Sequence, residues 1–239
     1  MQLIINKVVK SVIMTTQEII TELRTLSTPD HFAKLAHFGI NNTKALGIKT
    51  PLLRQMAKNI GKNHLLSLEL WKTDIFEARL LASMIENPVD ITEIQFDSWV
   101  KDFDSWAICD QCCSVLGKTL FSLQKINEYS IRSEEYVKRT AFVLMCEQAV
   151  HHKKAENELF YHFLGLIEQE AYDDRNFVRK AVNWALRQIG KRNEVLRLKS
   201  LETCELLLLQ DTKSSRWIAK DAIRELKSPE VISRMKGKM

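Results

Sequence analysis

Glycine and proline are scarce in this chain, with 7 and 4 residues among 239. Folds built from many β-strands need frequent turns, where these two residues are enriched, so their scarcity disfavours an all-β protein and favours long helices. The sequence also lacks any apolar run of the ~18 residues that would suggest a membrane span. Residues 1–15 have some apolar character, but Lys7, Lys10 and Ser11 interrupt it and no small-residue cleavage site follows. We therefore expect a loosely ordered extension at residues 1–15, not a signal peptide.

The five cysteines form an odd set without the spacing of a disulfide framework. Free thiols in a reducing cytoplasm are the simplest expectation, and we predict a cytoplasmic protein. Cys109 and Cys112 form a CxxC, but no second ligand pair follows at the spacing of a structural zinc site, so we expect no bound metal. His151 and His152 are expected to be solvated at a helix end. A glycine-rich phosphate loop is absent as well, so nucleotide hydrolysis has no support.

The proportions of hydrophobic and charged residues are those of a folded protein with a charged surface. Hydrophobic residues make up 45% and charged residues 27%, enough to bury a core and keep the surface polar. The net charge is +5 and the isoelectric point about 8.9. This mild basic excess is compatible with a polyanionic partner but does not indicate one by itself.

Helical periodicity runs almost from end to end of the sequence. Thr50 and Ser228 each precede a proline that suits the first helical turn, and Asp104 and Ser133 are two further candidate caps. The connections are short, and neither β-alternation of useful length nor a low-complexity linker interrupts them. The helices expected from this pattern are Thr16–Leu26, Pro29–Phe38, Pro51–Ile60, Leu65–Trp71, Ile75–Glu86, Thr92–Asp102, Ser105–Gly117, Leu120–Tyr129, Glu134–His151, Glu156–Ala171, Asn176–Lys191, Val195–Leu209, Lys213–Leu226 and Pro229–Met235.

Many short helices with short loops predict an all-α solenoid, in which helix pairs stack and each pair buries its face against its neighbours. Internal sequence similarity is weak, so the repeats have diverged. We expect a single curved domain over residues 16–239, with a site on its concave surface. The acidic segment around Glu168, Glu170, Asp173 and Asp174 is expected to be solvated.

The segment Asn176–Lys191 has its apolar residues on one side and Lys180, Arg187 and Lys191 on the other. Trp184 falls among these basic residues. An aromatic ring among cations suits nucleic acid, where cations meet phosphates and the ring meets a sugar or base. The alternative is that Trp184 packs against a neighbouring helix.

Two further helices place polar groups beside apolar faces. In Ser105–Gly117, Trp106 and Asp110 are four residues apart and share a face away from the core side. This arrangement suits either a functional carboxylate against an indole or a solvated aspartate beside a buried tryptophan. The segment Glu134–His151 is apolar nearly all round and is expected to be buried. Its Arg139 then needs an anion, for which Asp110 or a DNA phosphate are candidates, unless the side chain reaches water.

Four stretches together resemble the AlkD-type DNA alkylation repair family: LGIKTPLLRQMAK from residue 46, SWAICD from 105, YVKRTAFVLM from 136 and FVRKAVNWALRQIGK from 177. Their order and spacing fit the family from about residue 16 to 226. The resemblance implies a HEAT-like repeat solenoid that holds duplex DNA on its concave face. It also implies hydrolysis of the N-glycosidic bond of N3- and N7-alkylated purines without a metal or organic cofactor.

The resemblance also assigns roles to individual residues. It implies a catalytic group made of Asp110, Trp106, Trp184 and Arg139. DNA contacts are expected from Lys138, Lys180, Arg187 and Lys191. The expected partner is double-stranded DNA with alkylated purines, bound by a monomer.

Two other functions stay open at this point. The first is a helical-repeat protein that binds branched or distorted DNA without catalysis, as some relatives in this family do. The second is a scaffold whose concave face binds another protein. Asp110 with its two tryptophans favours the enzyme over the first alternative, and the basic residues around Trp184 favour DNA over a protein partner.

Overall fold

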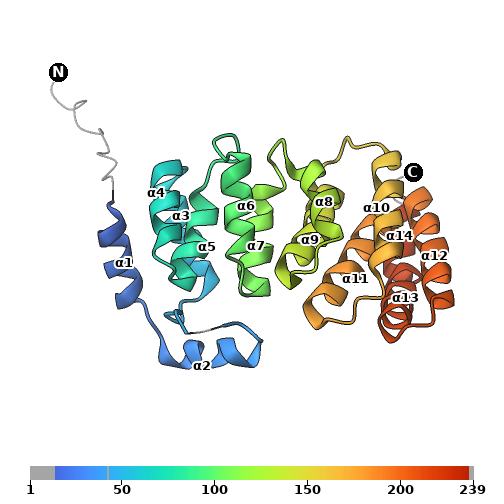
Figure 1. Ribbon diagram of the computed structural model, residues 1–239, viewed down its shortest axis with the longest axis horizontal. Coiled ribbons are helices and arrows are strands. Elements are labelled where there is room, and N and C mark those ends of the chain that lie inside the picture. The colour runs from blue at the N-terminus through green and yellow to red at the C-terminus, as the bar shows by residue number, and fades with distance from the viewer. Residues whose placement is uncertain (1–13, 42, 237–239) are drawn as a thin grey trace, which may run out of the picture. The chain divides into compact units, whose positions relative to one another are not determined.

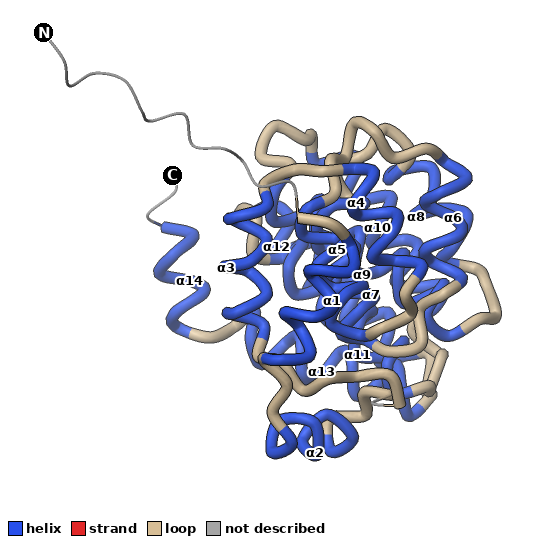
Figure 2. Tube along the Cα trace, turned by 90° about the vertical axis from the view of Figure 1, so that its left-hand side faces the viewer, coloured by secondary structure: helices blue, strands red, loops and turns tan. Residues whose placement is uncertain are grey.

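The computed structural model describes residues 14–41 and 43–236, and every regular element within them is a helix (Figures 1 and 2). The all-α prediction is therefore confirmed. The chain divides into two compact units, Met1–Asn87 and Pro88–Met239. The expectation of one domain over residues 16–239 is not tested by this division and stays a prediction. Most of the predicted extension, residues 1–13, lies outside the described residues. No described helix is both long enough and apolar enough to cross a membrane.

In the N-terminal unit, α3 and α4 pack on α5, and α1 contacts both α4 and α5. The buried carboxylate of Glu77 on α5 accepts hydrogen bonds from the backbone N–H groups of Leu46, Gly47 and Ile48 at 2.8, 2.7 and 3.1 Å. These bonds fix the loop that enters α3, and Gly47 adopts a positive φ of 78° there. The helices are α1 (Thr16–Thr25), α2 (Pro29–His37), α3 (Thr50–Ile60), α4 (His64–Lys72) and α5 (Phe76–Ile85).

The C-terminal unit has two layers of helices. In one layer α7, α9, α11 and α13 contact each other in succession, and in the other α8 contacts α10 and α10 contacts α12. Helix α9 lies centrally because it contacts α7, α8 and α11. The helices are α6 (Glu93–Lys101), α7 (Trp106–Leu116), α8 (Ser122–Ser130), α9 (Glu135–His151), α10 (Asn157–Glu170), α11 (Asn176–Gly190), α12 (Glu194–Leu209), α13 (Lys213–Leu226) and α14 (Pro229–Lys236).

The apolar pattern of the sequence explains this packing. Residues 137–146 of α9 are all buried, as expected for a helix that is apolar nearly all round. In α11 the expected apolar side is fully buried, and each of its valine, leucine and isoleucine side chains contributes about 1.5–3 kcal/mol relative to an exposed one. This side consists of Val178, Ala181, Val182, Ala185, Leu186 and Ile189.

Three of the four predicted helix caps are wrong. Lys49, not Thr50, precedes α3, and Ser105, not Asp104, accepts the hydrogen bond from the Ile108 N–H at the start of α7. Helix α9 begins after Glu134 without a side-chain cap, so Ser133 has no such role. The capping residue must have extended backbone angles and lie directly before the first helical turn. If the helix starts one residue earlier or later than predicted, the neighbouring residue becomes the cap. At Ser228 the hydroxyl does accept from the Val231 N–H, at 3.4 Å.

Candidate functional site

A carboxylate and a guanidinium meet where α7 packs against α9. The Arg139 Nε and Nη2 donate to Oδ1 and Oδ2 of Asp110 at 2.9 and 2.8 Å, a bidentate pair. The remaining terminal nitrogen, Nη1, donates to the backbone oxygen of Phe177 on α11 at 2.5 Å. Of the two candidate anions for Arg139, the structure therefore shows Asp110. With its donors used in this way, the arginine holds the carboxylate rather than facing solvent.

The local sequence places these groups. Ser105 caps the start of α7, so that Asp110 lies in the second turn of this helix. The apolar side of α7, which includes Ile108 and Cys112, is buried. Arg139 lies on the buried helix α9 with its side chain 7% exposed, whereas the Asp110 side chain is 22% exposed. The arginine is therefore the interior partner, and the carboxylate is the group that solvent or a ligand reaches.

Burial and the arginine act on Asp110 in opposite directions. Burial raises the pKa of Asp110, and this effect outweighs the lowering by the adjacent Arg139, so the pKa lies above its ordinary value of 3.8. The same pairing raises the pKa of Arg139 despite its burial. An adjacent guanidinium by itself favours the ionised form of a carboxylate. The structure brings the two together, but the net displacement of the Asp110 pKa is upward.

Aromatic residues lie on α7, α9 and α11, the three helices that meet at this pair. Trp106 is one turn before Asp110 on α7, and Trp184 is two turns after Phe177 on α11, and both are half-buried. The ring of Tyr136, one turn before Arg139 on α9, stacks on that of Phe177 at 6.0 Å with 29° between the planes. The sequence reasoning singled out neither Tyr136 nor Phe177. Tyr136 is three residues before Arg139, so helical spacing could have placed its ring beside the arginine. Phe177 is three residues before Lys180 on another helix, and spacing alone could not show that the two rings stack.

The basic residues of α11 differ from the expected solvent-facing stripe. Lys180 is exposed. Arg187 and Lys191 are half-buried and both pair with Glu225 on α13, Lys191 at 2.5 Å. Together they lower the pKa of Glu225 against the effect of its burial. Two of the three positive charges are thus compensated within the protein.

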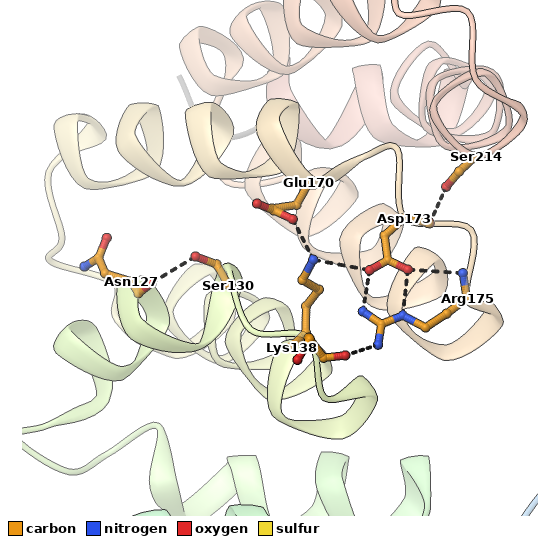
Figure 3. A network of polar contacts seen from close by, with 8 residues as sticks. Asn127, Ser130, Lys138, Glu170, Asp173, Arg175 and Ser214 are labelled. Carbon is orange, nitrogen blue, oxygen red and sulfur yellow. Dashed lines mark hydrogen bonds and ion pairs between the residues drawn. The ribbon is translucent and has the colours of Figure 1, made fainter.

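Lys138 occupies a different environment from an exposed DNA-contacting lysine. It is buried, and its Nζ donates to the Glu170 and Asp173 carboxylates at 2.6 and 3.3 Å (Figure 3). Arg175 completes the group by pairing with Asp173 at 2.5 Å. The prediction of a solvated acidic segment is therefore wrong for Glu170 and Asp173, which are both buried. The lysine that neutralises them lies more than thirty positions earlier in the sequence, beyond the reach of local patterns.

This network joins three elements around α9. The Ser214 hydroxyl at the start of α13 donates to the Asp173 backbone oxygen at 2.7 Å (Figure 3). Lys138 also lies 5.6 Å from the ring centroid of Tyr172. The ends of α10 and α13 and the loop before α11 are thus tied to the residue that precedes Arg139.

Four buried thiols lie on α7 and α9, the two helices that contribute Asp110 and Arg139. Cys109, Cys112 and Cys113 of α7 and Cys146 of α9 are buried and free, as is Cys204 on α12. Burial raises the pKa of Cys113 and of Cys146 well above the usual 9.0 and that of Cys204 to about 12. These thiols are core residues. The exposed positions of His151 and His152 agree with the expectation. The structure describes no cluster of three or more metal-ligating side chains in residues 14–41 and 43–236.

Comparisons with known proteins add a family and a fold. A family model described as DNA alkylation repair enzyme matches residues 19–226. A solved structure from a family related to the HEAT-like repeat DNA glycosylases, with affinity for branched DNA structures, has a TM-score of 0.78 and 17% sequence identity. The match covers 93% of this chain and 96% of that one, which confirms the HEAT-like repeat fold. None of the curated proteins compared with the chain matches its sequence.

Proposed function

Because the chain belongs to the family of DNA alkylation repair enzymes, we propose that it hydrolyses the N-glycosidic bond of N3- or N7-alkylated purines in duplex DNA. One observation supports this function above the others. Asp110 is a partly exposed carboxylate whose two oxygens are held by a buried arginine. Such a carboxylate has a fixed orientation before any substrate arrives, as electrostatic catalysis requires.

The proposed reaction uses the charge of the lesion. Alkylation at N3 or N7 makes the purine cationic, and when the C1′–N bond breaks, its electron pair neutralises the departing base. Positive charge then develops on the sugar, where the Asp110 carboxylate stabilises it. A water oxygen bonds to C1′ and gives a proton to Asp110 and then to solvent. The products are a free alkylated base and an abasic sugar.

Asp110 has acceptor capacity for this role. A carboxylate offers about four lone-pair sites, and Arg139 uses two of them, so further sites are left for water. We propose that Arg139 positions Asp110 instead of holding a DNA phosphate, because three of its five donors bond to Asp110 and the Phe177 carbonyl and its side chain is only 7% exposed. Trp106 and Trp184 would present ring faces to the cationic nucleoside, each contributing ~0.5–2 kcal/mol. No metal or organic cofactor enters this proposal.

A second candidate function is binding of branched DNA without catalysis. It is favoured by the structural likeness to a protein from a family with affinity for branched DNA. A bidentate, largely buried Asp110–Arg139 pair would then serve only to join α7 and α9. The monomeric state and the cytoplasmic location stay predictions under either function.

The test is release of base from methylated duplex DNA by the wild type and by Asp110→Asn. We expect base release by the wild type and a decrease of about 100- to 1000-fold in the variant. Binding to the same duplex, measured by fluorescence anisotropy, should change little because asparagine keeps one acceptor oxygen for Arg139. Circular dichroism of both proteins serves as the folding control.

Either alternative outcome is informative. If neither protein releases base and both bind branched DNA tightly, the non-catalytic function replaces this one. If Asp110→Asn loses helical content together with activity, the aspartate is structural. Glu147→Gln is the matched control, since Glu147 is a second half-buried carboxylate near α7 with a raised pKa, chiefly because of burial.

A further inference from the structure

The outward surface of α13 carries basic side chains and one tryptophan. The positions follow the spacing i, i+3, i+4, i+7 and i+11, which places them on one stripe of a helix. At 1.5 Å per residue the stripe is about 16 Å long. Its members, the five exposed residues of α13, are Lys213, Arg216, Trp217, Lys220 and Arg224. We refer to them as the α13 stripe.

The neighbouring helix shows that this composition is not general for the unit. The exposed positions of α12 comprise four aliphatic residues, two glutamates and one lysine. A polyanion would find no comparable surface there. These residues are Val195, Leu198, Lys199, Glu202, Glu205, Leu206 and Leu209.

Trp217 is the exposed aromatic group of the stripe, with 38% of its surface accessible. The guanidinium of Arg179 from α11 lies over its ring, 4.7 Å from the centroid. The Nε of Arg179 is buried and has no hydrogen-bond partner among the described residues. A cation stacked on one part of an indole with the rest of the ring accessible forms a platform on which another flat group can stack.

Some of the positive charges around this platform have carboxylate partners and others do not. Two are paired, Arg216 with Asp211 and Arg224 with Asp221. Lys213 and Lys220 of the stripe and Lys180 of α11 are exposed, and within residues 14–41 and 43–236 none of the three has a carboxylate partner. Ammonium groups therefore lie free on both sides of Trp217 along the helix.

We propose that the α13 stripe binds an unpaired DNA strand, with a base stacked on Trp217 and phosphates on Lys213 and Lys220. An aromatic ring between free cations matches the two parts of a single strand, a flat base and a regular row of charges. Bases in a duplex already stack on each other and offer no free face to an exposed ring. This binding goes beyond the hydrolysis proposed for Asp110 and does not depend on it.

The experiment measures binding of fluorescein-labelled oligothymidylate and of a hairpin duplex with the same number of phosphates. Trp217→Ala should raise the Kd for oligothymidylate by about 5- to 150-fold and leave the Kd for the duplex nearly unchanged. Trp217→Phe, which keeps an aromatic face, should retain most of the affinity, and Trp217→Leu should not. The double variant Lys213→Gln, Lys220→Gln should reduce the slope of log K against log salt by about 1.4.

Matched controls lie elsewhere in the same unit. Tyr161→Ala removes an exposed ring on α10, and the pair Lys101→Gln, Lys153→Gln removes two exposed lysines. Neither should change affinity for oligothymidylate. The proposal is wrong if Trp217→Ala or Trp217→Leu binds oligothymidylate as the wild type does. It is also wrong if the stripe variants weaken duplex binding alone, because the stripe would then contact a duplex backbone.

The outcome is separable from that of the proposed function. Asp110→Asn should bind oligothymidylate like the wild type, and Trp217→Ala should still release base from a methylated duplex. Trp217→Leu keeps an apolar side chain over the α11–α13 contact, so it provides a folded variant if Trp217→Ala does not fold.

Discussion

Lys138 and Arg139 are consecutive residues of α9, and the ion pairs that they form differ in almost every respect. Arg139 meets a single carboxylate, Asp110, that is 22% exposed. Lys138 meets two carboxylates that are 10% and 7% exposed, and Arg175 adds a second cation to Asp173. Successive positions on a helix point about 100° apart, so Lys138 faces the end of α10 and Arg139 faces α7.

The pKa values of Asp110 and Asp173 are displaced in opposite directions. Burial raises the pKa of both, but the Arg175 side chain and backbone N–H, with Lys138, bring the pKa of Asp173 below its usual 3.8. For Asp110 burial outweighs its one arginine, and the pKa is raised. A carboxylate surrounded by donors is a fixed structural charge. A carboxylate with one cation and an open side has acceptor capacity and a proton affinity left for chemistry.

The largest effect should come from breaking the Lys138 group. Lys138→Met leaves Glu170 without its cation in a buried position, and the free energy of unfolding should fall by about 3–5 kcal/mol. Urea denaturation followed by circular dichroism measures it. The exposed Lys101→Met is the matched control and should stay within about 0.5 kcal/mol of the wild type. A loss below about 1 kcal/mol for Lys138→Met would mean that water replaces the ammonium easily.

The corresponding change at the neighbouring position should affect activity more than stability. Arg139→Lys keeps the charge but loses the planar bidentate fork, so Asp110 is held less well. If base release takes place as proposed, its single-turnover rate should decrease by up to about 100-fold. Rates equal to the wild type would show that the orientation of Asp110 is unimportant.

A smaller loss of stability should follow from removing Ser214, which lies at the edge of the Lys138 group. Ser214→Ala removes the buried hydroxyl that donates to the Asp173 backbone oxygen at 2.7 Å. One such hydrogen bond contributes about 1 kcal/mol, and the free energy of unfolding should fall by that amount. Ser98→Ala, at an exposed position of α6, should be nearly neutral. Equal values for the two variants would remove Ser214 from the network.

The finest distinction between the aspartates is their pH dependence. The stabilisation from Asp173, with its folded pKa below 3.8, is complete above that pH and is lost as the pH falls through the folded value. Asp110, with its folded pKa above 3.8, contributes stability below that pH, which is lost as the pH rises through the folded value. Base release that needs the Asp110 carboxylate should therefore decline, on acidification, at a pH above 3.8.

Two titrations separate these expectations. The difference in unfolding free energy between the wild type and Asp173→Asn should shrink only at the acid end of a series from about pH 2.5 to 7. The acid limb of the single-turnover rate should lie higher than that transition. An acid limb at or below the Asp173 transition would contradict the assignment of Asp110 as the reacting group.

The sequence predicted the helices well because their apolar faces repeat clearly. Each expected helix is present, and its bounds differ by at most two residues, for example Lys213–Leu226, which is unchanged, and Leu120–Tyr129, which is observed as Ser122–Ser130. Caps were less predictable because a one-residue shift gives the role to a neighbouring polar side chain. The site was accessible in part, since a buried arginine needs an anion and Asp110 was one of two candidates.

Pairs between distant helices were not accessible from local patterns. Nothing near Glu170 or Asp173 in the sequence points to Lys138, and nothing near Arg187 points to Glu225. A polar face reads as solvated until the partner helix is known, so the basic side of α11 was overestimated. The α13 stripe was available from periodicity, but the stacking of Arg179 from α11 on its Trp217 was not.

The buried cysteines have a consequence for the survival of the protein itself. Agents that alkylate DNA also attack soft nucleophiles, and the thiolate, not the thiol, is the reactive form of cysteine. Here all five sulfur atoms lie in the interior, and burial holds Cys113, Cys146 and Cys204 as protonated thiols at neutral pH. Thiols that are buried and protonated are poor nucleophiles, so we expect the folded protein to react slowly with alkylating agents.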